Sequence, residues 1–241
     1  MADECFGHPR LAAIYDPLDP DRGDLDAYLR TAADLGARRV LDIGCGTGVF
    51  ALLLADRGIE VVGVDPAGAS IDVARAKPGS ERVRWLRGDA TDLPPLQVDL
   101  ATMTANVAQG IADPRAWQDT LRGAHAALRP GGHLVFETRD PARRAWQEWT
   151  REKSHRVTEI HGAGPVETWV ELVEVALPLV TFRWTYRFAA DGQVLTSDST
   201  LRFREREEVE RDLAARGFTV EDVRDAPDRP GKEFVFVARR A

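Results

Sequence analysis

The sequence predicts an α/β protein built on a parallel sheet, with antiparallel strands inserted towards the end of the chain. Three observations predict this class. Short apolar runs alternate with amphipathic helical segments through the first 140 residues. A glycine-rich turn at residues 44–48 joins a predicted strand to a predicted helix. After Pro141 the hydrophobic period changes to two, which is typical of half-buried antiparallel strands.

The first part of the chain contains the parallel strands and the helices that cover them. Asp24 is expected to cap the first helix and Gly36 to end it. Residues 128–132, Leu-Arg-Pro-Gly-Gly, are expected to form the turn before the fifth strand. The predicted strands are residues 39–43, 60–65, 83–87, 98–103 and 133–137, and the predicted helices are residues 25–35, 49–57, 70–76 and 114–128.

The later part of the chain predicts three antiparallel strands between residues 167 and 203. Aromatic residues at 182, 184, 186 and 188 alternate with polar ones, and Asp191-Gly192 marks a hairpin turn. A helix at 207–216 and two short strands at 219–223 and 234–238 complete the chain. Residues 143–204 are therefore interpreted as an inserted antiparallel annex, or lid, within a single domain of residues 1–241.

Composition excludes several classes of function. The net charge is −7, and 39 acids outnumber 32 bases, whereas a nucleic-acid or anionic-membrane binder usually presents a basic face. Two cysteines are too few for a disulfide framework. No signal peptide or membrane-length apolar run is visible, so a cytoplasmic protein is expected. No metal-ligand spacing occurs.

The most informative segment is Asp42-Ile43-Gly44-Cys45-Gly46-Thr47-Gly48, between a predicted strand and helix. Glycines at alternate positions let the backbone approach a ligand closely and turn into the helix. A tight turn that requires positive φ is the structural alternative. Asp65, which ends the next strand 21 positions after Gly44, is placed to accept both hydroxyls of an adenosine ribose.

Three details favour S-adenosylmethionine over a nicotinamide dinucleotide. The glycines run G-x-G-x-G, whereas the dinucleotide fingerprint is G-x-G-x-x-G. Asp42 would repel a pyrophosphate but suits a ligand that carries an ammonium and a sulfonium. A further acid, Asp89 in Gly88-Asp89-Ala90, follows the third strand, where it is placed for an adenine amino group.

On these motifs the sequence resembles the class I S-adenosylmethionine-dependent methyltransferases of small molecules, from about Val40 to Glu137. The resemblance implies a Rossmann-like sheet of seven strands, parallel except for a reversed last strand, with the cofactor over the strand C-termini. It also implies contacts to S-adenosyl-L-methionine. The implied cofactor-binding residues are Tyr15, Asp42, Gly44, Cys45, Gly46, Gly48, Asp65, Pro66, Asp89, Ala90 and Asn106.

The candidates for the chemistry lie mainly after the fourth and fifth strands. In the similar fold the loop with Asn106 and Gln109 lies beside the transferable methyl, where both side chains can orient an acceptor; capping of the next turn is the alternative. Arg139 can pair an anionic substrate group, or form a salt bridge to Glu137 or Asp140. His155 is a possible base in a polar connector, although a solvated surface histidine is the favoured interpretation.

The sequence thus predicts an enzyme that transfers a methyl group to N or O of a small-molecule acceptor. A non-catalytic S-adenosylmethionine-binding regulator and a nicotinamide-dependent oxidoreductase are the alternatives. Neither nucleic acid nor a membrane is an expected partner. The chain is expected to be a monomer or a homodimer.

Overall fold

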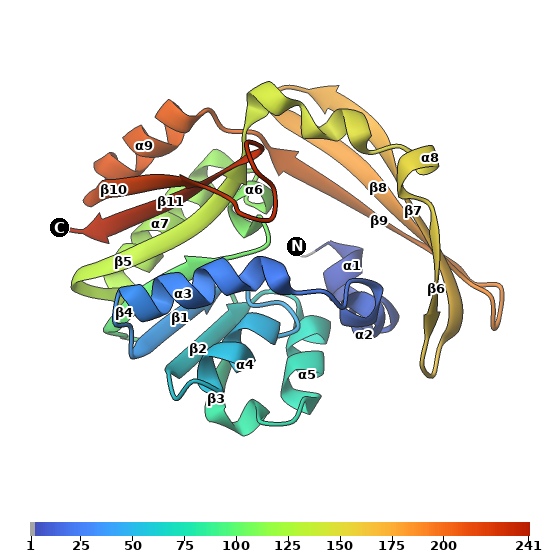
Figure 1. Ribbon diagram of the computed structural model, residues 1–241, viewed down its shortest axis with the longest axis horizontal. Helices are drawn as coiled ribbons and strands as arrows, with labels where there is room; N and C mark the ends of the chain where they lie inside the picture. Colours follow the sequence, from blue (N-terminus) through green and yellow to red (C-terminus); the bar gives the residue numbers. More distant parts are fainter. Residues whose placement is uncertain (1–2) are drawn as a thin grey trace.

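The computed structural model describes residues 3–241 and contains two sheets. The larger sheet has seven strands in the order β10-β11-β5-β4-β1-β2-β3 (Figure 1). Neighbours among β1 to β5 run parallel, and β11 runs antiparallel to both β5 and β10. The expected seven-stranded Rossmann-like sheet is confirmed. Its strands are β1 Arg39–Ile43, β2 Glu60–Asp65, β3 Val83–Arg87, β4 Val98–Met103, β5 Leu128–Arg139, β10 Phe218–Asp225 and β11 Glu233–Arg240.

Helices cover both faces of this sheet. One core layer joins α7 and α9 to alternate strand residues such as Leu41 and Val62, and the other joins α3 and α4 to their neighbours Val40 and Val61. Burial on both faces explains why the parallel strands are continuous apolar runs. The helices are α1 Glu4–Gly7, α2 Pro9–Leu18, α3 Asp26–Asp34, α4 Val49–Ala55, α5 Gly68–Ala76, α6 Val107–Gly110, α7 Pro114–Ala127, α8 Arg151–Ser154 and α9 Arg206–Ala215.

The second sheet is antiparallel and has the order β6-β7-β8-β9. Its strands are β6 Arg156–Ile160, β7 Gly164–Ala176, β8 Leu179–Phe188 and β9 Val194–Arg202. Tyr186 and Phe188 of β8 pack in one cluster with Leu11 and Ile14 of α2. Figure 1 shows this sheet curving past α1 and α2, so the N-terminal helices lie between the two sheets.

The structure corrects three local expectations. The polar connector contains a fourth antiparallel strand, β6, whose residues are mostly exposed and include only two apolar side chains, so it shows no hydrophobic alternation. Residues 128–132 belong to β5 itself, where Gly132 packs closely against the carbonyl oxygen of Asp99. Asp24 does not cap α3. It lies in a 3-10 turn, Gly23–Leu25, and accepts a hydrogen bond from Arg22.

Within residues 3–241, no helix has both the length and the apolar character needed to cross a membrane.

Candidate functional site

The loops that follow β1, β2, β4 and β5 meet at one edge of the large sheet. The register pairs Asp42 of β1 with Gly63 of β2 and with Thr102 of β4, and it pairs Met103 of β4 with Phe136 of β5. Because these strands are parallel, their carboxyl ends and the loops after them lie together. Ligands bind at this edge in open α/β sheets.

The glycine loop occupies the centre of this edge. Gly44, Gly46 and Gly48 all have positive φ, at 71°, 52° and 81°. A Cβ at Gly44 would lie 2.5 Å from a methyl carbon of Val107, so the loop and α6 are in close contact. At Gly46 a Cβ would meet nothing within 4 Å. The loop therefore packs tightly against α6 at one glycine and faces open space at the next.

Asp65 connects the glycine loop to the loop after β2. Its Oδ2 accepts a hydrogen bond from the Gly46 amide at 2.8 Å, and its Oδ1 accepts one from the Ala67 amide at 2.7 Å. Burial raises the pKa of this carboxyl, and the two amides counteract the rise. Each oxygen keeps a second lone pair, so the carboxylate can still accept from a ligand hydroxyl.

Asp42 is buried under the glycine loop with only 1% of its surface exposed. Oδ1 accepts from the Thr102 hydroxyl at 3.1 Å, whereas Oδ2 has no hydrogen-bond partner among residues 3–241. The pKa of Asp42 is raised to about 7, because burial and the charge of nearby Asp65 outweigh the lowering effects of Thr102 and Arg22. A buried acceptor without a partner is costly, and a cationic or hydrogen-bond-donating ligand would satisfy it.

Helix α2 is attached directly to the glycine loop. The Thr47 hydroxyl donates to Asp16 Oδ1 at 2.6 Å, and Lys77 forms an ion pair with the same carboxylate. Lys77 also donates to the Thr47 carbonyl at 2.7 Å. Tyr15, one residue before Asp16, packs on Phe6, and burial raises its pKa to about 12. Sequence patterns did not single out the Asp16, Thr47 and Lys77 contacts, because no spacing rule relates these positions.

The loop between β4 and α6 has an unusual backbone. Ala105 and Asn106 are both left-handed, with φ of 56° and 61°, which is strained for residues other than glycine. The Asn106 amide donates to the buried carboxylate of Glu137, and its side-chain nitrogen donates to Glu233 at 3.3 Å. Asn106 makes no side-chain cap to α6, and its Oδ1 has no partner among the described residues. The capping alternative for Asn106 is therefore wrong.

A buried polar cluster supports this loop from β5 and β11. Arg139 donates to Gln109 at 3.0 Å and lies 3.5 Å from Glu233, so of the alternatives for Arg139 the salt bridge to Glu137 or Asp140 is wrong. Glu137 instead accepts from the Tyr28 hydroxyl, and burial raises its pKa to about 8. The sequence could not indicate the partners of Arg139 and Glu137, since β5 meets α3, α6 and β11 only in the folded chain.

The remaining candidates lie apart from the glycine loop or at its margin. His155 is exposed and lies 2.8 Å from Glu167, which also pairs with Arg187. Asp89 is exposed and accepts from the Thr91 amide at 2.8 Å, while Ala90 is buried. Cys45 is buried, which raises the pKa of its thiol well above the ordinary value and keeps it protonated.

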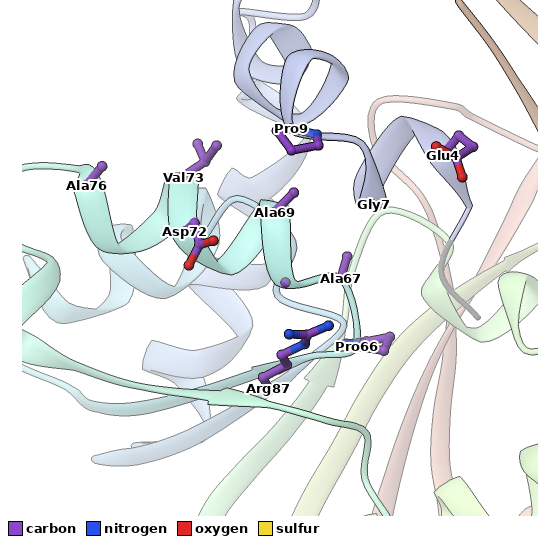
Figure 2. A pocket seen from close by; sticks show the side chains of 11 residues that line it. Glu4, Gly7, Pro9, Pro66, Ala67, Ala69, Asp72, Val73, Ala76 and Arg87 are labelled. Carbon is purple, nitrogen blue, oxygen red and sulfur yellow. The ribbon is translucent and has the colours of Figure 1, made fainter.

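Pro66 lines an open pocket of about 810 Å³ beside α5. Figure 2 shows Pro66 and Arg87 at its base and Pro9 of α2 on the opposite side. The pocket borders the loop after β2 and contains none of the glycine-loop residues, so it is a neighbour of the candidate site.

The donor and acceptor pattern fits S-adenosylmethionine. Asp42 Oδ2 and Asn106 Oδ1 are buried acceptors without partners among residues 3–241, and the space beside Gly46 is open. Such acceptors suit a ligand that offers an ammonium, a sulfonium and hydroxyl donors. A pyrophosphate offers no hydrogen-bond donor for them and is repelled by acids. In the described part of the chain, no group of three or more His, Cys, Asp or Glu side chains is arranged to hold a metal.

Comparisons with known proteins point the same way. Residues 40–132 match the model of a methyltransferase domain. The cypemycin N-terminal methyltransferase of a Streptomyces species is 36% identical over 126 residues, which are 52% of this chain and 51% of that protein. The chain thus spans about half the length of this curated relative.

Two solved structures show the fold along nearly the whole chain. The CcbJ methyltransferase from Streptomyces caelestis superposes with a TM-score of 0.79 at 23% identity, covering 100% of both chains. The S-adenosylmethionine-bound CalS10, an amino pentose methyltransferase from Micromonospora echinaspora, gives 0.69 at 22% identity and 95% of both chains.

The matched region contains the glycine loop, Asp65 at the end of β2 and Asp89 after β3. The domain match favours the methyltransferase over the oxidoreductase alternative. The domain match and the fold agree: residues 40–132 are similar to methyltransferase domains, and the chain as a whole has the fold of these two solved methyltransferases.

Proposed function

We propose that this protein transfers the methyl group of S-adenosylmethionine to a small-molecule acceptor, at N or O, with an amine nitrogen as the favoured acceptor. The observation that carries the proposal is the contact between the glycine loop and α6. It sets the acidic cofactor side, with Asp42 and Asp65, directly against the loop of Asn106 and Gln109.

Each acid has a separate part in the proposed binding of the cofactor. Asp65 accepts the ribose hydroxyls, Asp42 faces the positively charged end, and Asp89 with the Ala90 backbone holds adenine. Tyr15 covers the cofactor from α2, whose attachment to Thr47 supports a closed arrangement. When bound, the sulfonium supplies an activated methyl group with a neutral thioether as the leaving group. The residues around it then have to align the acceptor and exclude water.

The protonation states at the strand ends favour an amine acceptor. Glu137 is buried, which raises its pKa to about 8, and its two oxygens already accept from the Asn106 amide and the Tyr28 hydroxyl, so it is not free to take a proton from an acceptor. His155 is exposed and pairs with Glu167, and His133 is half-buried and pairs with Glu221. Neither histidine is among the residues of the glycine loop or of α6. A free amine needs no base to attack. The names of CalS10 and the cypemycin enzyme also describe an amino pentose and an N-terminus.

We further propose that residues 143–204 act as an annex that selects the acceptor within a single domain. The root of the annex follows Arg139 at the carboxyl end of β5, on the ligand side of the sheet. The net charge of −7 supports a small acceptor over a nucleic acid, and the two free, buried cysteines suit a reducing cytoplasm. We propose a monomer or homodimer.

The test is a turnover screen read by mass spectrometry. Purified protein with S-adenosylmethionine is incubated with panels of amino sugars, peptide N-termini and phenols, and the gain of one methyl group is recorded. We expect turnover on amines. Binding of S-adenosylhomocysteine by calorimetry without turnover on any panel would identify a non-catalytic binding protein instead.

A further inference from the structure

Arg204 has the smallest exposed fraction of the arginines in the described part of the molecule. It lies between the end of β9 and the start of α9, with 1% of its surface exposed. Nη1 donates to the Ala108 carbonyl at 2.9 Å, and Nη2 donates to the Ile111 carbonyl at 2.6 Å. Both carbonyls belong to α6 or to the residue after it. Arg204 therefore joins the end of the antiparallel sheet to the helix beside the glycine loop.

No carboxylate lies within ion-pair distance of Arg204 among residues 3–241. Its guanidinium carbon lies 4.5 Å from the centre of the Trp117 ring, whose indole nitrogen donates to Asp212 at 2.8 Å. Burial lowers the pKa of Arg204 to about 10, so it remains charged near neutral pH. A buried charge is costly unless hydrogen bonds satisfy it, and an apolar side chain would pack here at lower cost. The geometry thus indicates a role beyond packing.

Helix α6 has only four residues, too few to be stable by itself, so contacts at its two ends determine its position. At its start, the strained Asn106 is held by Glu137 and Glu233. At its end, Arg204 holds the carbonyls. Between them, Val107 packs against Gly44.

We propose that Arg204 is a positioning residue for methyl transfer, which transmits the position of the antiparallel sheet to α6 and so places Asn106 against the glycine loop. The inference rests on the proposed function. Arg204 itself touches neither cofactor nor acceptor. It acts through the backbone of α6, and a small displacement there is enough to slow a reaction that depends on alignment, since 1 Å can cost about 100-fold.

The experiment compares Arg204→Lys and Arg204→Met with the matched control Arg202→Lys. Lys keeps the charge but reaches only one carbonyl, and Met keeps the length without charge. Arg202 is two residues away, partly exposed, and lies 3.7 Å from Glu208. Each variant is measured for turnover with the fastest amine of the screen, for affinity to S-adenosylhomocysteine, and for hydrogen exchange of residues 104–112.

We expect Arg204→Lys to lower kcat about tenfold and Arg204→Met about 100-fold, on the scale at which misalignment slows catalysis. The dissociation constant for S-adenosylhomocysteine should stay within about twofold, because the acids of the cofactor side are untouched. Faster exchange should be confined to residues 104–112. Arg202→Lys should match the wild type in all three measurements.

Two results would overturn the inference for Arg204. One is unchanged exchange of residues 104–112 in a folded Arg204→Lys variant. The other is a loss of turnover and of S-adenosylhomocysteine affinity by the same factor, which indicates a structural role only. If Arg204→Met does not fold, the Lys variant decides alone. If the wild type turns over no acceptor, the proposed function fails, and the exchange and affinity data still test whether Arg204 positions α6.

Discussion

The two acids that flank the glycine loop, Asp42 and Asp65, are both buried but have different partners. Asp65 accepts hydrogen bonds from two backbone amides, which stabilise its ionised form. Asp42 has one hydroxyl partner and one oxygen without any among the described residues. Because their hydrogen-bond partners differ, the two carboxyls should affect ligand binding differently when they are mutated or when the pH changes.

For Asp65, replacement by Ala should weaken S-adenosylmethionine binding by about 1.5–3 kcal/mol, which is the usual cost of losing charge-assisted hydrogen bonds. The fold should survive, since the residue ends β2 at the ligand edge. Calorimetry provides the measurement, with Glu60→Gln at the exposed start of the same strand as control. An unchanged dissociation constant in folded Asp65→Ala protein would show that Asp65 does not bind the ribose.

For Asp42, the raised pKa predicts a pH-dependent affinity. Burial raises it from the ordinary value of 3.8 to about 7, so the folded protein binds more protons and its stability falls as pH rises through this range. A cationic ligand favours the ionised carboxylate. S-adenosylmethionine affinity should therefore increase about tenfold from pH 6 to pH 8, as the carboxyl of the free protein ionises.

Asp42→Asn should remove this pH dependence, whereas Asp89→Asn should keep it, because Asp89 is exposed. Binding titrations at several pH values provide the measurement. If the Asp42→Asn variant keeps the full slope, another group such as Glu137, whose pKa is about 8, is responsible.

Among the elements, the contact between the glycine loop and α6 is the one that defines the proposed site. Gly44 and Gly58 have similar backbones, with φ of 71° and 76°, but a Cβ at Gly44 meets Val107 while one at Gly58 meets nothing within 4 Å. Substitution at Gly58 therefore measures backbone strain alone, whereas substitution at Gly44 measures backbone strain together with the close approach of α6.

Gly58→Ala should lower the free energy of unfolding by about 1–2 kcal/mol, the cost of a left-handed Ala, without changing cofactor affinity. Gly44→Ala should show the same strain, and the clash of its Cβ with Val107 should also push the glycine loop itself out of place, so cofactor affinity should fall. Thermal unfolding and calorimetry measure the two effects. Val107→Ala should partly restore binding to Gly44→Ala, and the absence of any rescue would contradict the steric explanation.

In the molecule as a whole, the two faces of the antiparallel sheet have different neighbours, and adjacent residues of β8 show the difference. Trp184 of β8 packs with the cluster that includes residues of α1 and α2. Its neighbour Arg183 points to the other face, where it forms two hydrogen bonds with Asp198 at 2.6 and 2.7 Å. Only the first face adjoins the helices attached to the glycine loop.

Trp184→Ala should therefore change acceptor turnover severalfold while leaving S-adenosylhomocysteine affinity unchanged, because Asp42 and Asp65, the proposed cofactor acids, belong to the other sheet. Arg183→Ala is the matched control on the exposed face and should leave both unchanged. Steady-state kinetics and calorimetry provide the comparison. If Trp184→Ala leaves turnover unchanged in stable protein, the annex does not select the acceptor through this face.

Local sequence patterns were enough to predict the parallel half of the fold and the acids beside its glycine loop. Strands β1 to β4 begin and end where the sequence predicts, and in the central strands β1, β2 and β4 this is because burial on both faces requires a mainly apolar run. Asp42 and Asp65 could be identified because each lies within a local strand-to-loop transition, whose geometry depends on adjacent residues.

Contacts between distant segments could be known only from the folded chain. Arg139 pairs with Glu233, Glu137 with Tyr28, and Arg204 with α6. Periodicity indicates which face of an element is buried, but not which element covers it, so none of these partners could be predicted. Strand β6 escaped prediction for the related reason that an edge strand with exposed faces carries no apolar pattern. The proposed cofactor side of the site is thus encoded in local motifs, whereas the arrangement around α6 results from packing between segments far apart in the chain.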